Sequence, residues 1–145
     1  MQSGYVEALQ IQRNRELSFE NVQFVELEEG KGIIGDCHAM GGEKQIALIS
    51  SNAKIWTVTQ EIEGLCLARF QENIVTEGLN YAYLNQGDIL KTNAATIEVT
   101  AYSKRCFLEC RLIQENQPCE LKIGIRFAKV VQSGRIQVGD KIWKE

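Results

Sequence analysis

Hydrophobic and polar residues alternate in several short stretches of this chain. Between residues 4 and 12 the apolar positions are Val6, Ala8, Leu9 and Ile11, with one break in the phase of the alternation. A period of two residues is typical of a β-strand with one buried face. The same pattern, or a short apolar run, predicts further strands over 22–27, 45–50, 95–101, 108–114 and 124–132.

Residues 52–63 allow two interpretations. Ser51 or Asn52 could cap a helix that runs to about residue 61 or 63. Residues 55–59, however, are all β-branched or aromatic, which favours a strand. We interpret the segment as a helix and expect one or two short helices in an otherwise β fold.

Glycine residues mark the connections between the predicted strands. Residues 29–42 contain five glycines in fourteen positions, which disfavours a regular helix and indicates a shaped loop. Gly87-Asp88 and Gly139-Asp140 each lie between an apolar residue three positions before the glycine and another two positions after the aspartate. A glycine at such a turn supplies a positive φ, so the two motifs predict two similar corners. The chain is therefore predicted to form one barrel-like β domain over residues 1–145.

The composition is that of an ordinary globular protein, with 44% hydrophobic and 24% charged residues. A net charge of −3 argues against general nucleic-acid binding, which normally needs a basic face. No apolar run approaches the length of a membrane span, and the first residues show no basic segment followed by an apolar one, so neither a membrane protein nor a secreted one is expected. Five cysteines, an odd number, predict free thiols in a reducing compartment, and we expect a cytoplasmic protein.

Cys106 directly follows two cations, Lys104 and Arg105. Adjacent positive charges favour the thiolate, which is the form that attacks an electrophile or binds a metal. The alternative is that Cys106 is a small buried hydrophobic residue, the usual fate of a free cysteine. Cys110 could face the same way and act as a second thiol. The other cysteines lack a comparable cationic setting and are interpreted as structural or incidental: Cys37, Cys66 and Cys119. The spacings do not predict a structural zinc site.

The single histidine, His38, lies in the glycine-rich loop two residues after Asp36. In an extended backbone these two side chains point to the same side. Lys44 follows shortly after, and glycine N–H groups, an imidazole and an ammonium would together form an anion-binding cradle. The alternative is that Asp36 makes a local turn hydrogen bond and that His38 is a structural partner.

A second polar group lies within residues 70–79. Glu72, Asn73 and Thr76 bring a carboxylate, an amide and a hydroxyl into five positions. These side chains could orient a polar ligand or satisfy the backbone of a loop. Residue type does not decide between the two roles.

Taken in order, these segments resemble the MOSC domain, which is found at the C-terminus of molybdenum-cofactor sulfurases. The resemblance rests on the order and spacing of its pieces from about residue 30 to the C-terminus. The matching pieces are 32–38, 44–48, 72–79, Gly87-Asp88, 97–100, Arg105-Cys106 and 124–140. Family members commonly have arginine where this chain has Lys44. Lysine keeps the positive charge, but it cannot form the bidentate hydrogen bonds of a guanidinium group.

The resemblance implies a barrel-like β fold and a role with the molybdenum cofactor (molybdopterin). In related enzymes that reduce N-hydroxylated compounds, the cysteine that matches Cys106 supplies a thiolate to molybdenum. Cys106 is thus the implied catalytic residue and metal ligand. The cofactor's pterin carries a phosphate, and the implied binding residues are Gly35, Asp36, His38, Lys44, Gln45, Glu72, Asn73, Thr76 and Arg105. The chain shows no lysine-bearing domain of the sulfurase type, so no pyridoxal phosphate site is expected on it.

Three functions are compatible with this resemblance. The chain could be a carrier that binds the cofactor or shuttles sulfur to it, which its small size favours. It could instead be a molybdenum-dependent reductase component for N-hydroxylated substrates that takes electrons from a partner. A non-catalytic ligand-binding barrel is the third. The expected partners are proteins of cofactor biosynthesis, molybdoenzymes or an electron-transfer protein, and neither nucleic acid nor membrane is expected.

Overall fold

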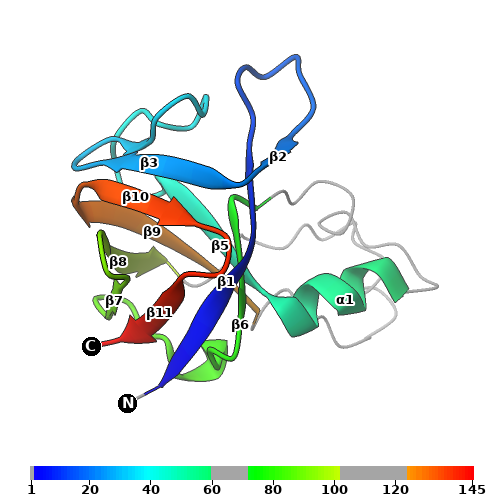
Figure 1. Ribbon diagram of the computed structural model, residues 1–145, viewed down its shortest axis with the longest axis vertical. Coiled ribbons are helices and arrows are strands. Elements are labelled where there is room, and N and C mark those ends of the chain that lie inside the picture. The colour runs from blue at the N-terminus through cyan, green and yellow to red at the C-terminus, as the bar shows by residue number, and fades with distance from the viewer. Residues whose placement is uncertain (1, 60–71, 102–123) are drawn as a thin grey trace.

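The computed structural model describes residues 2–59, 72–101 and 124–145, which form a β-barrel with one α-helix beside it (Figure 1). The strands are β1 (Ser3–Ile11), β2 (Glu20–Val22), β3 (Phe24–Glu28), β4 (Gly32–Ile33), β5 (Ile46–Ser50), β6 (Ile74–Glu77), β7 (Ile89–Lys91), β8 (Thr96–Ala101), β9 (Ile125–Gln132), β10 (Gly134–Gln137) and β11 (Lys141–Lys144). The helical segments are α1 (Ser51–Thr59) and the short 3-10 helix η1 (Tyr81–Tyr83). Neither helical segment in these ranges has the length and apolar character needed to span a membrane. The mainly β fold is confirmed, whereas the predicted strand 108–114 lies outside the described residues.

Seven strands close the barrel in the order β11-β7-β8-β9-β5-β6-β1, and β1 pairs with β11 to complete the circle. All of these pairs are antiparallel except the pair of β5 with β6. A parallel pair needs a crossover connection, and α1 belongs to the connection between these two strands. β2 extends the sheet beyond β1, and β10, β3 and β4 form a separate three-stranded sheet.

The break in phase along β1 corresponds to a β-bulge. Val6 pairs with Thr76 and Ala8 pairs with Val75, so one extra residue of β1 stands opposite β6. Val6 and Leu9 consequently belong to the same apolar cluster, although three positions separate them, and Ala8 packs against the other cluster.

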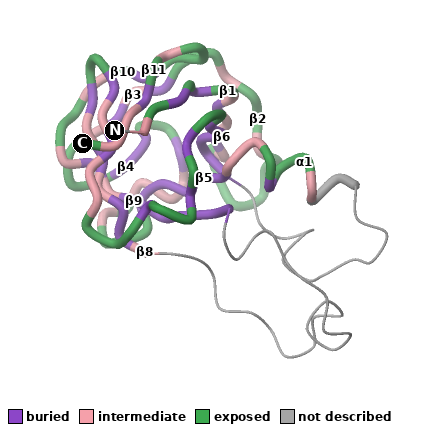
Figure 2. Tube along the Cα trace, turned by 90° about the horizontal axis from the view of Figure 1, so that it is seen from below, coloured by how far each residue is buried: buried purple, intermediate pink, exposed green. Residues whose placement is uncertain are grey.

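Apolar side chains form two clusters on opposite faces of the barrel wall, and the buried positions follow the strands of that wall (Figure 2). The larger cluster fills the interior and includes Ile46 and Leu48 of β5. The smaller cluster includes Ala47 and Ile49 of the same strand and Ala53 of α1. Because both faces of β5 are buried, its sequence is a continuous apolar run with no alternation.

The two Gly-Asp corners have the same geometry, as their matching sequences predict. Gly87 and Gly139 have φ values of 94° and 95°. In each corner the aspartate Oδ2 accepts a hydrogen bond from the backbone N–H three residues earlier, over 2.7 Å at Asp88 and 2.9 Å at Asp140. Each corner then delivers the chain into a strand, β7 in the first case and β11 in the second.

Two expected elements differ in detail from the structure. The predicted strand 22–27 is two strands, because the chain passes at Gln23 from the sheet that contains β2 to the sheet that contains β3. The helix is confirmed over residues 51–59, but its cap is Ser50, whose Oγ accepts a hydrogen bond from the Ala53 N–H over 3.1 Å. The remainder of the predicted helix, to residue 61 or 63, lies outside the described residues.

Candidate functional site

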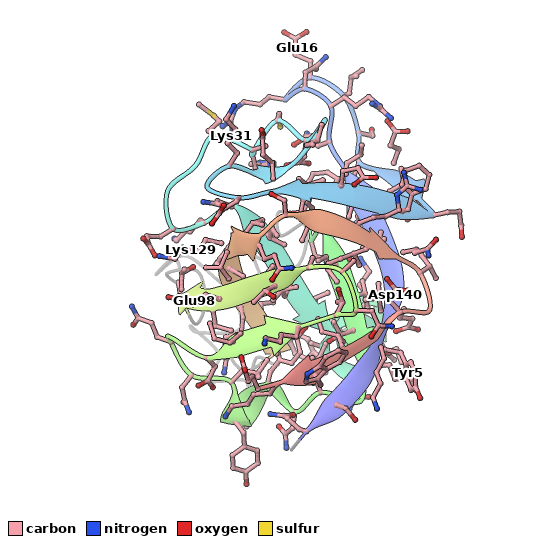
Figure 3. All side chains as sticks on the ribbon, turned by 60° about the vertical axis from the view of Figure 1, so that its left-hand side comes forward. Tyr5, Glu16, Lys31, Glu98, Lys129 and Asp140 are labelled. Carbon is pink, nitrogen blue, oxygen red and sulfur yellow. The ribbon has the colours of Figure 1, made fainter. Side chains whose placement is uncertain are left out.

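Two loops project from the same end of the barrel: the connection between β1 and β2, which carries Glu16, and the glycine-rich loop after β3, which carries Lys31 (Figure 3). Gln12 joins them. Its backbone N–H donates to Oδ1 of Asp36 over 2.8 Å, and its carbonyl accepts from the Cys37 N–H over 2.7 Å. The glycine-rich loop is therefore held against the end of β1.

Asp36 is buried and orients His38. Oδ2 of Asp36 accepts a hydrogen bond from the His38 backbone N–H over 2.9 Å and lies 3.0 Å from Nδ1 of the imidazole. Gly35, with φ of 91°, and a backbone bond from Ala39 N–H to the Asp36 carbonyl shape this segment as a turn. The predicted proximity of the two side chains is thus correct, but a turn produces it and not an extended backbone.

The His38 ring is half-buried between Phe19 and Cys37. Its centroid lies 6.2 Å from that of Phe19 at an interplanar angle of 29°, and Nδ1 lies 3.6 Å from Sγ of Cys37. Sγ also lies 3.5 Å from Oε1 of Gln12. Cys37 therefore lies beside the candidate site, whereas its lack of cationic neighbours in the sequence indicates a structural or incidental residue. The adjacent histidine in the sequence was the signal that could have indicated it.

Asn73 and Gln45 support the site from within the fold. Oδ1 of Asn73 accepts from the Ala47 N–H over 3.0 Å, and Nδ2 donates to the Gln10 carbonyl over 3.2 Å and to Oδ1 of Asp36 over 3.4 Å. Gln45 is also buried, and its side chain donates to the Gly42 carbonyl and accepts from the Val130 N–H, both over 2.9 Å. The amide groups of both residues thus satisfy backbone atoms.

Glu72 and Thr76 are buried and contact other parts of the fold. Glu72 accepts a hydrogen bond from Nζ of Lys54 on α1. Thr76 Oγ1 lies 2.8 Å from the hydroxyl of Tyr81. Burial raises the pKa of Tyr81 far above its ordinary value, and the hydrogen bond with Thr76 only partly opposes that rise. These contacts place Glu72 against the helix and Thr76 in the interior of the barrel.

Lys44 is exposed and lies near the strand end that precedes Cys106 in the chain. Its Nζ is 5.0 Å from the centroid of the Phe127 ring, and Phe127 pairs with Ala101 at the end of β8. Arg105 and Cys106 follow Ala101 by four and five positions and lie outside the described residues, as do Cys66, Cys110 and Cys119. Their predicted roles stay predictions.

Two of the described side chains near the loop end of the barrel carry groups that could bind an anion. Half-buried His38 and exposed Lys44 are donors suited to a phosphate. The Gly41 N–H is used within the loop, since it donates to the Lys31 carbonyl over 3.1 Å. Within residues 2–59, 72–101 and 124–145, no group of three or more His, Cys, Asp or Glu side chains is arranged to hold a metal ion.

Comparison with known proteins gives one family and several similar folds. The family model described as the MOSC domain matches residues 36–143. Comparison with curated proteins found no match. The matched range begins at Asp36 and includes most of the barrel, α1 and the residues named above from Asp36 onward.

Among solved structures, the fold is similar to that of the YUAD protein from Bacillus subtilis, with a TM-score of 0.71 at 18% identity over 98% of this chain and 97% of that one. YiiM from Geobacillus stearothermophilus has a TM-score of 0.63 at 18% identity, over 98% of this chain and 75% of that one. YiiM from Escherichia coli has a TM-score of 0.61 at 17% identity, over 100% of this chain and 70% of that one. At these identities the likeness shows a shared fold.

Proposed function

The chain belongs to the MOSC domain family, and from this we propose that it binds the molybdenum cofactor or carries the sulfur attached to it, through the thiolate of Cys106. The observation that carries the proposal is the geometry at the start of the matched range, where the Asp36 carboxylate holds the only imidazole of the chain in the glycine-rich loop. MOSC domains are associated with cofactor binding and with sulfurase-like roles.

In this proposal His38 and Lys44 bind the phosphate of the pterin. Asp36 fixes the imidazole, and Gly35 supplies the turn that brings it there. Asn73 and Gln45 support this arrangement through their bonds to backbone atoms. Glu72 and Thr76 stabilise the contact with α1 and the barrel interior. When bound, the cofactor supplies the redox or sulfur-transfer chemistry at molybdenum.

Cys106 provides the sulfur in either form of the proposal. Arg105 and Lys104 favour its thiolate, a soft ligand that suits a metal held by other sulfur atoms. In sulfur transfer the same thiolate carries a persulfide. The partners would be proteins of cofactor biosynthesis or molybdoenzymes that take up the product, and the protein would act in the cytoplasm.

The test is to purify the protein from cells that make the cofactor and to measure molybdenum, pterin and cysteine persulfide. We expect the wild-type protein to contain pterin, together with either molybdenum or a persulfide on Cys106. In Cys106→Ser the molybdenum content should fall at least about tenfold, or the persulfide should be absent. Cys110→Ser, four residues away, is the matched control and keeps both. Lys44→Gln lowers the pterin content while the fold is unchanged.

Three results separate the alternatives. Wild-type protein without pterin, molybdenum or persulfide contradicts the proposal and leaves a ligand-binding barrel. Equal metal and persulfide in wild type and Cys106→Ser contradicts the role of that thiol. Reduction of an N-hydroxylated substrate with an artificial electron donor identifies a reductase component and replaces the carrier role.

A further inference from the structure

The chain between the glycine-rich loop and β5 directs two successive carbonyl groups toward the barrel wall. The Gly42 carbonyl accepts a hydrogen bond from Nε2 of Gln45 over 2.9 Å, and the Glu43 carbonyl accepts one from Oγ1 of Thr100. Both donor side chains are buried. Gln45 also accepts a hydrogen bond from the Val130 N–H of β9, and Thr100 lies on β8, which pairs with β9. The two carbonyls are therefore fixed on the same side of the segment.

The peptide groups that carry these carbonyls fix the direction of two N–H groups. No cis peptide bond occurs among the described residues, and in a trans peptide the N–H points opposite to the carbonyl. The N–H groups of Glu43 and Lys44 consequently both point away from the wall. In an extended strand successive carbonyls point to opposite sides. Gly41 and Gly42, with φ values of 79° and 82°, provide the turn that aligns them here.

Neither of these two N–H groups has an acceptor in the part of the chain that the structure describes. Most N–H groups earlier in the glycine-rich loop donate within the protein, among them those of Cys37, His38 and Gly41. Successive main-chain N–H groups on a turn form a concave site for an anion. The end of the loop, where Glu43 and Lys44 present such groups, therefore offers main-chain donors that the rest of the loop has already used.

A positive charge is carried by one of the same residues. Lys44 is exposed, forms no ion pair with any of the described residues, and holds its Nζ 5.0 Å from the centroid of the Phe127 ring. Its four-carbon stem is flexible, so the ammonium can reach an anion held by the main chain. The neighbouring carboxylate of Glu43 is exposed and lies 3.8 Å from Nζ of Lys129, so a cation offsets part of its charge.

We propose that the N–H groups of Glu43 and Lys44, together with the Lys44 ammonium, form a phosphate-binding site. Gln45 and Thr100 are positioning residues for this site, because they hold the carbonyls that set the direction of the N–H groups. The inference rests on the proposed function, in which the phosphate is that of the pterin, and deepens it by naming the main-chain donors. Hydrogen bonds from main-chain N–H groups to a charged oxygen are stronger than those to a neutral acceptor.

The experiment uses the full-length protein from cells that cannot make the cofactor and follows its amide NMR signals while inorganic phosphate is added. We expect the signals of Glu43 and Lys44 to shift saturably. Thr100→Val should raise the dissociation constant at least about threefold, because the peptide that carries the Lys44 N–H is no longer fixed. Thr100→Ser keeps the hydroxyl and should retain the wild-type affinity. Thr96→Val, on the same strand, removes a hydroxyl that contacts Gln132 and is the matched control, with no change expected.

The ammonium is tested separately from the main-chain donors. Lys44→Gln should weaken phosphate binding at least about threefold and should make it less sensitive to salt, because a charge is lost while the N–H groups remain. In the same variant the Glu43 amide signal should still shift with phosphate.

Two results overturn the inference: no saturable shift of the Glu43 and Lys44 signals, or equal affinity in wild type and Thr100→Val when circular dichroism shows a native fold. Protein from cells that make the cofactor is titrated in parallel. Bound pterin should occupy the site and abolish the response to phosphate, and a full response in pterin-containing protein contradicts the assignment of the site to the pterin.

Failure of this site and failure of the proposed function are distinguishable. Pterin and molybdenum in the wild-type protein without any phosphate-induced shift at Glu43 and Lys44 keep the proposed function and contradict the site. Saturable shifts in a protein that takes up neither pterin nor molybdenum and carries no persulfide do the reverse.

Discussion

Asn73 donates a hydrogen bond from Nδ2 to Oδ1 of Asp36 over 3.4 Å and thereby connects the start of β6 with a turn 37 residues earlier. The same side chain satisfies the backbone of two barrel strands, β5 at Ala47 and β1 at Gln10. The position of His38 therefore depends, through Asp36, on the packing of three strands of the barrel wall.

Replacement of Asn73 by alanine should cost about 1–3 kcal/mol of unfolding free energy, because the buried N–H of Ala47 loses its acceptor. Urea unfolding followed by circular dichroism measures the loss. Asn52→Ala, in the exposed first turn of α1, is the control and should change the value by less than about 0.5 kcal/mol. Equal effects of the two substitutions would show that Asn73 does not support the wall.

The ion pair between Glu72 and Lys54 should be energetically coupled. Glu72 is 1% exposed, so Lys54→Met leaves a buried carboxylate without this partner. We expect a loss of about 1–3 kcal/mol, which is less than for a fully buried pair because the Lys54 side chain is 45% exposed. A double-mutant cycle with Glu72→Met measures the coupling, and the double variant should lose less than the sum of the single losses. Strict additivity would contradict the coupling.

Gly139 should tolerate asparagine better than valine. Its φ of 95° is unfavourable for a β-branched residue, whereas a Cβ atom at this position meets nothing within 4 Å, so backbone conformation alone determines the cost. We expect Gly139→Val to lower the unfolding free energy by about 1–3 kcal/mol and Gly139→Asn to lower it by less. Equal losses in urea unfolding would indicate that crowding and not φ is the cause.

The corner at Asp88 should make stability depend on acidic pH. The hydrogen bond from the Asn85 N–H, followed by that from Lys144 and its charge, holds the pKa of Asp88 below its ordinary value. A carboxylate whose pKa is lower in the folded than in the unfolded chain adds stability above the unfolded pKa and loses it as the pH falls through the folded pKa.

The difference in unfolding free energy between wild type and Asp88→Asn should therefore be largest near neutral pH and should shrink below about pH 4. Urea titrations at several pH values measure this difference. Lys144→Gln should reduce the pH dependence only in part, because the larger contribution comes from the Asn85 backbone. A difference that stays constant down to acid pH would contradict the assignment.

Local features of this fold were predictable from the sequence, but the pairing of strands that lie far apart in the chain was not. The corners at Gly87 and Gly139 follow from short motifs, and the bulge in β1 appears as a break in alternation. By contrast, the separation of β2 from β3 at Gln23 depends on which distant strand pairs with each half. No local pattern contains that information.

The same distinction holds for the candidate site. Asp36 and His38 are neighbours in sequence, so their contact could be expected. The bonds of Asn73 and Gln45 to backbone atoms depend on packing between segments far apart in the chain. Residue type alone left two interpretations open for Asn73, a contact with a ligand or a bond to the loop backbone. The setting of Cys37 was missed because only flanking cations, and not the adjacent imidazole, were weighed.

The pairing of Ser3 with Trp143 has a consequence for biosynthesis. β1 is synthesised long before its neighbour β11, so a nascent chain cannot complete the circle while residue 143 is still inside the ribosome. Until β11 has been made, the edge of β1 that pairs with it is not covered by that strand. Closure must follow the synthesis of β11, and pairing across so long a separation makes it a slow step in folding.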